Sequence, residues 1–298
     1  MIIGFIVACT GAIFFSTKAI IVKKAFADTH IRALALLTLR MLFSIPFYVA
    51  AAFFASNRKD NVKFTPRLWL AISATGIFGY YLSSLFDFMG LQYISAGLER
   101  LILFLYPTFA VLINAWVFHQ PVSNTQRTAL LLTYAGIGIA YFGELKIDNT
   151  NPNFLWGSFL IFICAVTYSF YLAASGRLIS KTGVTKFTAY SMLAATLGIV
   201  LHFIITKEYQ KISITNNMIC YGLLLALIAT VIPSFMLSYG MKKIGSNNTA
   251  IITSIGPVST ILQAHFILGE KIFAAQIAGT LLVIAGIVLT GLKTRTTG

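Results

Sequence analysis

The chain has 298 residues, of which 58% are hydrophobic and 10% are charged. Because soluble domains carry about 25% charged residues, this composition excludes an ordinary soluble protein and predicts an integral membrane protein in contact with the lipid bilayer. The formal net charge is +14. The basic residues lie at the ends of apolar runs instead of forming one basic stripe, so no nucleic-acid partner is predicted.

Ten apolar runs follow one another along the chain. Each is long enough for a transmembrane helix, which takes about 20 apolar residues. The runs cover residues 2–22, 32–55, 67–91, 94–118, 125–143, 154–178, 186–206, 218–241, 247–268 and 272–292. We therefore expect an all-α polytopic membrane protein of ten transmembrane helices. The first run begins directly after Met1 without a basic leader, so we do not expect a cleaved signal peptide.

The short connections between the runs carry most of the charge, and their basic residues predict the orientation in the membrane. With the N-terminus in the cytoplasm, the inner connections hold twelve Lys and Arg residues and the outer connections hold seven. This excess predicts a multi-pass protein of the inner (cytoplasmic) membrane with both termini on the cytoplasmic side.

Two basic residues lie inside the first two predicted spans. A charged group in the bilayer interior costs at least a few kcal/mol, so such residues usually face a bundle interior or a wet cavity. Lys18 lies near the far end of the first span, where it either extends to the membrane surface or lines a cavity. Arg40 lies too deep in the second span to reach the surface. We expect it to pair with a carboxylate or with helix carbonyls, as a structural clamp or as a direct contact for an anionic group.

The third and fourth predicted spans hold a tyrosine pair and two acidic residues. Tyr80 and Tyr81 are candidates for lining a cavity, whereas Asp87 and Glu99 lie near span ends and are expected to approach the outer surface. Glu99 and Arg100 are about 100° apart on a helix, so we expect one to face the pore and the other a neighbouring helix. A carboxylate in a low-dielectric setting binds a proton more readily, which makes Asp87 and Glu99 candidates for proton coupling. A static ion pair is the alternative.

Polar and aromatic residues recur at helical spacing in later spans, on one face of the sixth span and one face of the ninth. The further candidates for a substrate cavity are Tyr106, Tyr168, Tyr171, Thr253, Thr260 and Gln263. Ordinary helix packing is the alternative for this set. Pro107 and Pro257 fall in mid-span, where each frees a carbonyl and can bend its helix, so we predict that they act as hinges. A static bend is the alternative.

An internal repeat divides the chain into two halves. Residues 94–143 align without gaps on the sequence 150 residues later, and the alignment pairs Pro107 with Pro257. The repeat predicts one five-helix unit over residues 1–143, a polar connection over 144–153 and a second five-helix unit over 154–298. Because five is odd, the second unit enters the membrane upside down. Such inverted repeats are typical of secondary transporters, whose substrate site lies between the halves.

The chain resembles the EamA family of the drug/metabolite transporter superfamily over nearly its whole length. The resemblance rests on Phe15-Ser16-Thr17-Lys18, Arg40 with Pro46, Tyr93-Ile94-Ser95-Ala96-Gly97 before Pro107, and Pro257, Leu268-Gly269-Glu270, Gln276, Gly279 and Gly286 in the second half. It implies ten helices in two EamA repeats and transport of metabolites such as amino acids, often outward. One departure is visible, because the first half has Gln120 where the second has Glu270.

These observations together predict a secondary transporter, an exporter or exchanger, that moves a small-molecule solute by alternating access, with the proton as the candidate coupling ion. An intramembrane enzyme is a rival class, but the histidines are scattered and neither His-Glu-x-x-His nor Gly-x-Ser-x-Gly occurs. No enzyme, metal or cofactor is therefore predicted. A membrane sensor or scaffold without transport is the remaining alternative.

Overall fold

The computed structural model describes residues 2–57, 63–106, 108–109, 112–113, 124–147, 151–244 and 255–293, and the regular structure in these ranges is helical. The first half contains α1 (Ile2–Thr29), α2 (Ala33–Ser56), α3 (Pro66–Gly76), η1 (Ile77–Leu82), α4 (Ser83–Gly90), α5 (Ala96–Leu103) and α7 (Asn124–Ile147). The second half contains α8 (Phe154–Thr182), α9 (Val184–Ile205), η2 (Glu208–Lys211), α10 (Asn216–Ala226), η3 (Leu227–Val231), α11 (Ile232–Ile244), α13 (Ile255–Gln263), η4 (Ala264–Leu268) and α14 (Ala274–Lys293).

The described residues confirm an all-α protein built to lie in a membrane. Six helices are long and apolar enough to cross a bilayer, and three shorter apolar helices cover 131–143, 255–268 and 274–286. The fourth and ninth predicted spans lie partly outside the described residues. Large apolar side chains such as Phe54, Leu70 and Phe266 are 70–80% exposed, as expected for helix faces in contact with lipid.

Two of the long helices contain a turn of π-helix in the middle. One runs from α3 through η1 to α4, and the other runs from α10 through η3 to α11. The two π-helical segments begin at Ile77 and Leu227, which are 150 residues apart, the same offset as the sequence repeat. A π-helical turn inserts one extra residue and is frequent at functional sites.

Hydroxyl side chains mark the starts of several helices. Thr65 before α3, Ser95 before α5 and Thr215 before α10 each accept a hydrogen bond from the amide three residues later, at 3.0–3.4 Å. The first amides of a helix have no partner within it, and such a cap contributes about 1 kcal/mol. The caps therefore fix where the chain turns back into the bundle.

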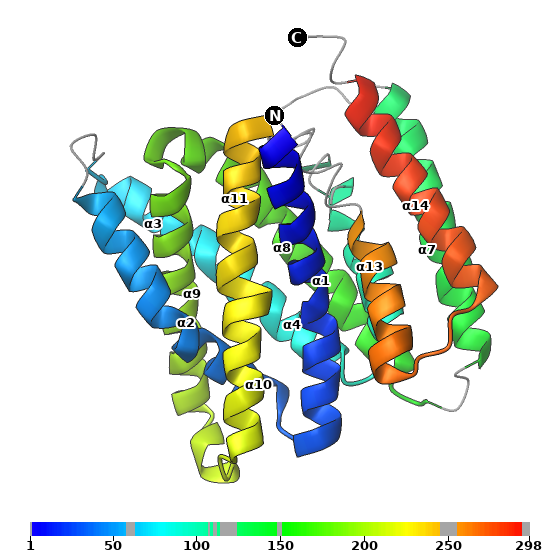
Figure 1. The fold of residues 1–298 in the computed structure, drawn as a ribbon, viewed down its shortest axis with the longest axis horizontal. Helices are drawn as coiled ribbons and strands as arrows, with labels where there is room; N and C mark the ends of the chain where they lie inside the picture. Colours follow the sequence, from blue (N-terminus) through cyan, green and yellow to red (C-terminus); the bar gives the residue numbers. More distant parts are fainter. Residues whose placement is uncertain are drawn as a thin grey trace.

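Helices of the two halves pack against each other (Figure 1). Near the middle of the bundle, α1 lies beside α11 and α13, and α8 packs on α4 and α5. On one side α2 packs against α9, and on the other α7 and α14 form a close pair. The contacts follow the sequence repeat. The helix 150 residues after α1 is α8, and the helix 150 residues before α11 is α4, so the contact of α1 with α11 has its counterpart in the contact of α8 with α4.

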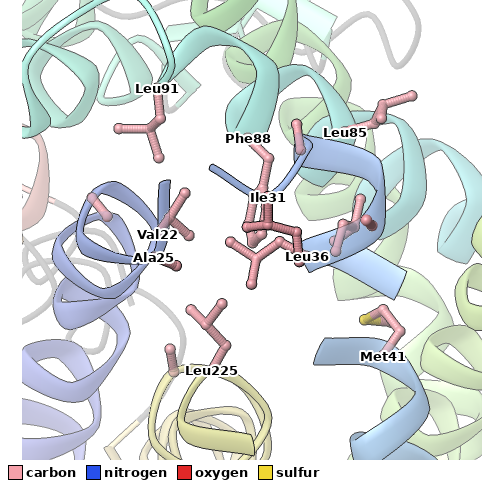
Figure 2. Close-up of a cluster of buried hydrophobic side chains, with 14 of the residues drawn as sticks. Val22, Ala25, Ile31, Leu36, Met41, Leu85, Phe88, Leu91 and Leu225 are labelled. Carbon is pink, nitrogen blue, oxygen red and sulfur yellow. The ribbon is translucent and has the colours of Figure 1, made fainter. Parts of the chain in front are cut away.

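An apolar cluster fills one end of the bundle, where α1, α2, α4 and α10 meet (Figure 2). Val22, Ala25, Leu36, Phe88 and Leu225 are each 0% exposed and point toward one another across these helices. Lipid tails are as apolar as these side chains, so close packing rather than escape from water holds helices together in a membrane. The cluster therefore closes the bundle at the end where α1 and α4 finish.

The close contact of α7 and α14 gives a test of the packing. A Cβ atom added to Gly136 or Gly279 would overlap the carbonyl oxygen of the other glycine. We expect Gly136→Ala to push the helices apart and to lower the unfolding temperature of the detergent-purified protein by several degrees.

Gly138→Ala is the matched control on the same helix, because a Cβ there meets no atom within 4 Å. Alanine is about 1 kcal/mol more favourable than glycine in a helix interior, so this variant should be as stable as the wild type or slightly more so. Equal unfolding temperatures for the two variants would contradict the close contact.

Candidate functional site

A cavity of about 70 Å³ lies between helices of both halves. Its walls come from α1, α2, η1, α4 and α5 of the first half and from α8 and α11 of the second. The lining residues are Ala12, Phe15, Lys18, Arg40, Gly79, Tyr80, Ser83, Ser84, Asp87, Arg100, Leu103, Phe104, Tyr106, Cys164, Tyr168 and Leu237. Six of the residues predicted for the site are among them: Lys18, Arg40, Tyr80, Asp87, Tyr106 and Tyr168.

A buried ion-pair cluster joins three helices beside this cavity. The Nζ of Lys18 on α1 lies 2.7 Å from Oδ2 of Asp87 on α4 and 3.5 Å from Oε1 of Glu99 on α5. The three side chains are 7%, 1% and 0% exposed. Lys18 therefore lines the cavity instead of extending to the membrane surface. Both carboxylates turn inward to this ammonium group. Their expected depth near the outer membrane surface stays a prediction.

Arg40 on α2 is held by neutral groups. Its Nε donates a hydrogen bond to Oγ1 of Thr230 in η3 at 2.6 Å, and its guanidinium lies 5.4 Å from the ring centroid of Phe88. The residue is 2% exposed. The expected pairing with a carboxylate or a carbonyl is not seen among the described residues, where a hydroxyl and an aromatic face take that place. Nη1 of Arg40 has no hydrogen-bond partner among the described residues.

Arg100 on α5 is placed in a similar way. Its Nη2 donates a hydrogen bond to Oγ of Ser16 at 2.9 Å, and its guanidinium lies 5.4 Å from the ring centroid of Phe15. Its Nε has no partner among the described residues. Glu99 and Arg100 do face different neighbours, as helix geometry predicts. It is Arg100, however, that lines the cavity, whereas Glu99 lies against Lys18.

Four tyrosines form a continuous aromatic wall beside the cavity; Tyr80, Tyr106 and Tyr168 line it, and Tyr171 lies behind them without lining it. The hydroxyl of Tyr171 donates a hydrogen bond to that of Tyr80 at 3.3 Å, and the rings of Tyr168 and Tyr171 stack with centroids 5.7 Å apart. Tyr106 meets Tyr168 edge to face at 5.2 Å. A side chain at Gly79 would overlap Tyr171, so this glycine allows the wall to reach η1.

Other predicted site residues do not line the cavity. Tyr81 pairs with the imidazole Nδ1 of a histidine on α9 at 2.9 Å. On α13, Thr260 donates to the backbone oxygen of Ser16 at 3.4 Å, and Gln263 forms a 2.8 Å hydrogen bond within its own helix. Pro257 is buried in the first described turn of α13. Two predicted residues, Thr253 and the hinge candidate Pro107, lie outside the described residues.

Sequence reasoning did not place several residues that contribute to the site. Ser83 and Ser84 line the cavity, and Thr230 holds Arg40. One available signal was the repeat offset, since Thr230 is the counterpart of Tyr80. Serines inside an apolar run carry little signal, because they also bond to their own helix, as Ser83 does with Gly79 at 2.5 Å.

Polar contacts tie the helix ends together at the end of the bundle closed by the apolar cluster. Lys23 donates a hydrogen bond to the backbone oxygen of Ile94 at 2.6 Å and lies 3.9 Å from the Glu270 carboxylate, which accepts from the amide of Ala96 at 3.1 Å. Nearby, Arg32 pairs with Glu208 at 2.9 Å. These contacts place the end of α1 and the segments before α2, α5 and α14 at the same end of the bundle.

Comparisons with known proteins identify the family and a similar fold. The chain matches the EamA-like transporter family over residues 2–142 and again over 155–292. A solved crystal structure of a protein that is 18% identical, aligned over 99% of this chain and 97% of its own, superimposes with a TM-score of 0.70. At that identity the similarity concerns the fold alone.

Two relatives by sequence carry transporter names. The chain is 30% identical over 302 residues to the uncharacterized transporter YcbK of Bacillus subtilis, an alignment that covers 98% of this chain and 94% of the relative. It is 20% identical to an uncharacterized transporter of Archaeoglobus fulgidus, in an alignment that covers 85% of this chain and 86% of the relative. This multi-pass membrane protein therefore belongs to the EamA-like transporter family.

Proposed function

We propose that this membrane transporter moves a small metabolite, an amino acid or a related amphipathic solute, by alternating access as an exporter or exchanger. The observation that carries the proposal is the buried charged cavity between helices of both halves. An intramembrane ionisable residue marks a substrate or ion pathway by default, and here Lys18, Arg40 and Arg100 converge on one space.

The proposal includes two inverted five-helix repeats, residues 1–143 and 154–298, joined by the connection 144–153, with ten transmembrane helices in all. Three observations support it: the helix contacts that follow the repeat, the two π-helical segments at the same offset, and the cavity lining. Lys18 and Tyr168 both line the cavity, as do Asp87 and Leu237, and each pair is 150 residues apart.

The closed end of the bundle supports alternating access. The apolar cluster around Phe88 and the contacts of Lys23 and Glu270 seal one end, and the two sides of that seal come from different halves. A carrier of this type opens by moving one repeat against the other. We propose that this end faces outward and that both termini lie in the cytoplasm, in the inner membrane.

The ion-pair cluster supports a proton as the coupling ion. One ammonium faces two carboxylates, so the fully ionised cluster of Lys18, Asp87 and Glu99 carries one excess negative charge. A single proton bound to either carboxylate makes the cluster neutral. Proton binding and release would thus change the charge beside the cavity during the transport cycle.

Transport itself is tested with the purified protein in liposomes. We expect entry of radiolabelled solutes from a metabolite mixture to saturate with concentration and to be accelerated by unlabelled solute on the opposite side. Non-saturating flux would indicate a channel. Binding without any flux would favour a sensor or scaffold and contradict the proposal.

The coupling role is tested with Glu99→Gln. This change keeps the side-chain shape and leaves Lys18 paired with Asp87, so the folded yield should stay near that of the wild type. We expect flux to fall several-fold and to lose its dependence on pH. Glu208→Gln removes a carboxylate of the closed end that does not line the cavity. It is the matched control for the loss of an acid, and its flux should keep the wild-type dependence on pH. Wild-type flux at every pH in Glu99→Gln would remove this carboxylate from coupling.

The orientation is tested by labelling single cysteines in a variant that lacks the native ones. Asn57 and Gln210 are both exposed, at the ends of the second and seventh predicted spans. We expect a membrane-impermeant maleimide to label Gln210→Cys in intact cells and Asn57→Cys only after permeabilisation. The reverse pattern would invert the proposed topology.

A further inference from the structure

Two arginines face the cavity, and neither forms an ion pair in the described part of the chain. Arg40 and Arg100 come from α2 and α5 and are 2% and 4% exposed. Their contacts are hydroxyl groups and aromatic rings, and each retains a buried N–H group without a hydrogen-bond partner among these residues, at Nη1 and Nε respectively.

The nearby carboxylates pair with a different cation. Asp87 and Glu99 both lie against Lys18, and the described residues show no ion pair to either arginine. Three cations and two carboxylates leave one net positive charge at the cavity. Because an uncompensated buried charge is costly, the site is poised to receive an anion from outside the protein.

The chemistry of the walls narrows the kind of anion. A guanidinium group has a planar fork of donors that matches a carboxylate or a phosphate. While both carboxylates are ionised, the one net positive charge is balanced by the single negative charge of a carboxylate, which favours a carboxylate over a doubly charged phosphate ester. Beside the arginines, the walls are largely apolar or aromatic, with Phe15, Tyr106 and Tyr168 in the lining.

We propose that the solute is a small organic anion, with its carboxylate bound between Arg40 and Arg100 and its apolar part against the aromatic wall. This inference rests on the proposed transport function and specifies the solute that the cavity takes. Lys18 is then left to the proton-binding cluster, so the charge that binds solute and the charge that binds a proton belong to different residues.

The test uses the detergent-purified full chain and matched small molecules. The probes are phenylacetate and isobutyrate, their amides, phenethylamine and phenyl phosphate. A ligand that binds only the folded protein raises its unfolding temperature in proportion to the logarithm of concentration over Kd. We expect the carboxylates to raise that temperature and the amides and the amine to have no effect.

Variants then assign the binding to the two arginines. Arg40→Gln and Arg100→Gln should each weaken carboxylate binding about tenfold or more, since removing a buried charge partner has effects of this size. Arg67→Gln is the matched control, because Arg67 is exposed at the start of α3. If Arg40→Gln gives no folded protein, Arg40→Lys replaces it. Lysine keeps the charge but lacks the planar fork of donors, so this variant should also weaken carboxylate binding. Arg100→Gln tests the second contact independently.

Several results would overturn the inference: no carboxylate binds, the amides or the amine bind as well as the carboxylates, phenyl phosphate binds more tightly, or the arginine variants keep wild-type affinity. Flux measurements distinguish failure of the anion-site proposal from failure of the proposed transport function. Saturable flux of a neutral or cationic solute alone would reject the anion site but preserve the transporter. Carboxylate binding without flux would preserve the anion site but reject transport.

Discussion

The ion pairs of Lys18 with Asp87 and Glu99 are the interaction around which the cavity is organised. A single charge in the bilayer interior is costly, and it becomes tolerable when an opposite charge lies at hydrogen-bonding distance. Lys18 on α1 therefore draws in α4 and α5, and its neighbour Ser16 receives Arg100. One turn of α1 thus positions most of the charged groups of the site.

The arginines are held differently, and the difference matters for function. A hydroxyl and an aromatic face hold a guanidinium group in place without neutralising it, as Thr230 and Phe88 do for Arg40. The arginines remain positively charged at the cavity and can bind a solute, while Lys18 pairs with the two carboxylates of the protein. Because both acids pair with Lys18, they do not occupy the arginines. Solute binding and proton binding can therefore belong to different residues.

Backbone irregularities bring these groups together. The π-helical turns η1 and η3 place Tyr80 on the cavity wall and Thr230 against Arg40, and the two residues occupy equivalent positions in the repeat. Gly79 lets Tyr171 approach η1. Since close packing provides the cohesion between membrane helices, small residues at such contacts determine how tightly the halves meet around the cavity.

The sequence by itself determined the membrane class, the order and approximate limits of the apolar helices, and the positions of the buried charges, because hydropathy and rare intramembrane charges are local properties. The repeat and the family pattern also predicted a central cavity, and six of the proposed residues line it. Only the tertiary structure decided which charges pair. Lys18 and Asp87 are distant in sequence, and helical periodicity specifies a direction around one helix but not the neighbour found there. For the same reason the sequence left open whether Glu99 or Arg100 faces the cavity, and the packing of α5 against α1 turned Arg100 into it.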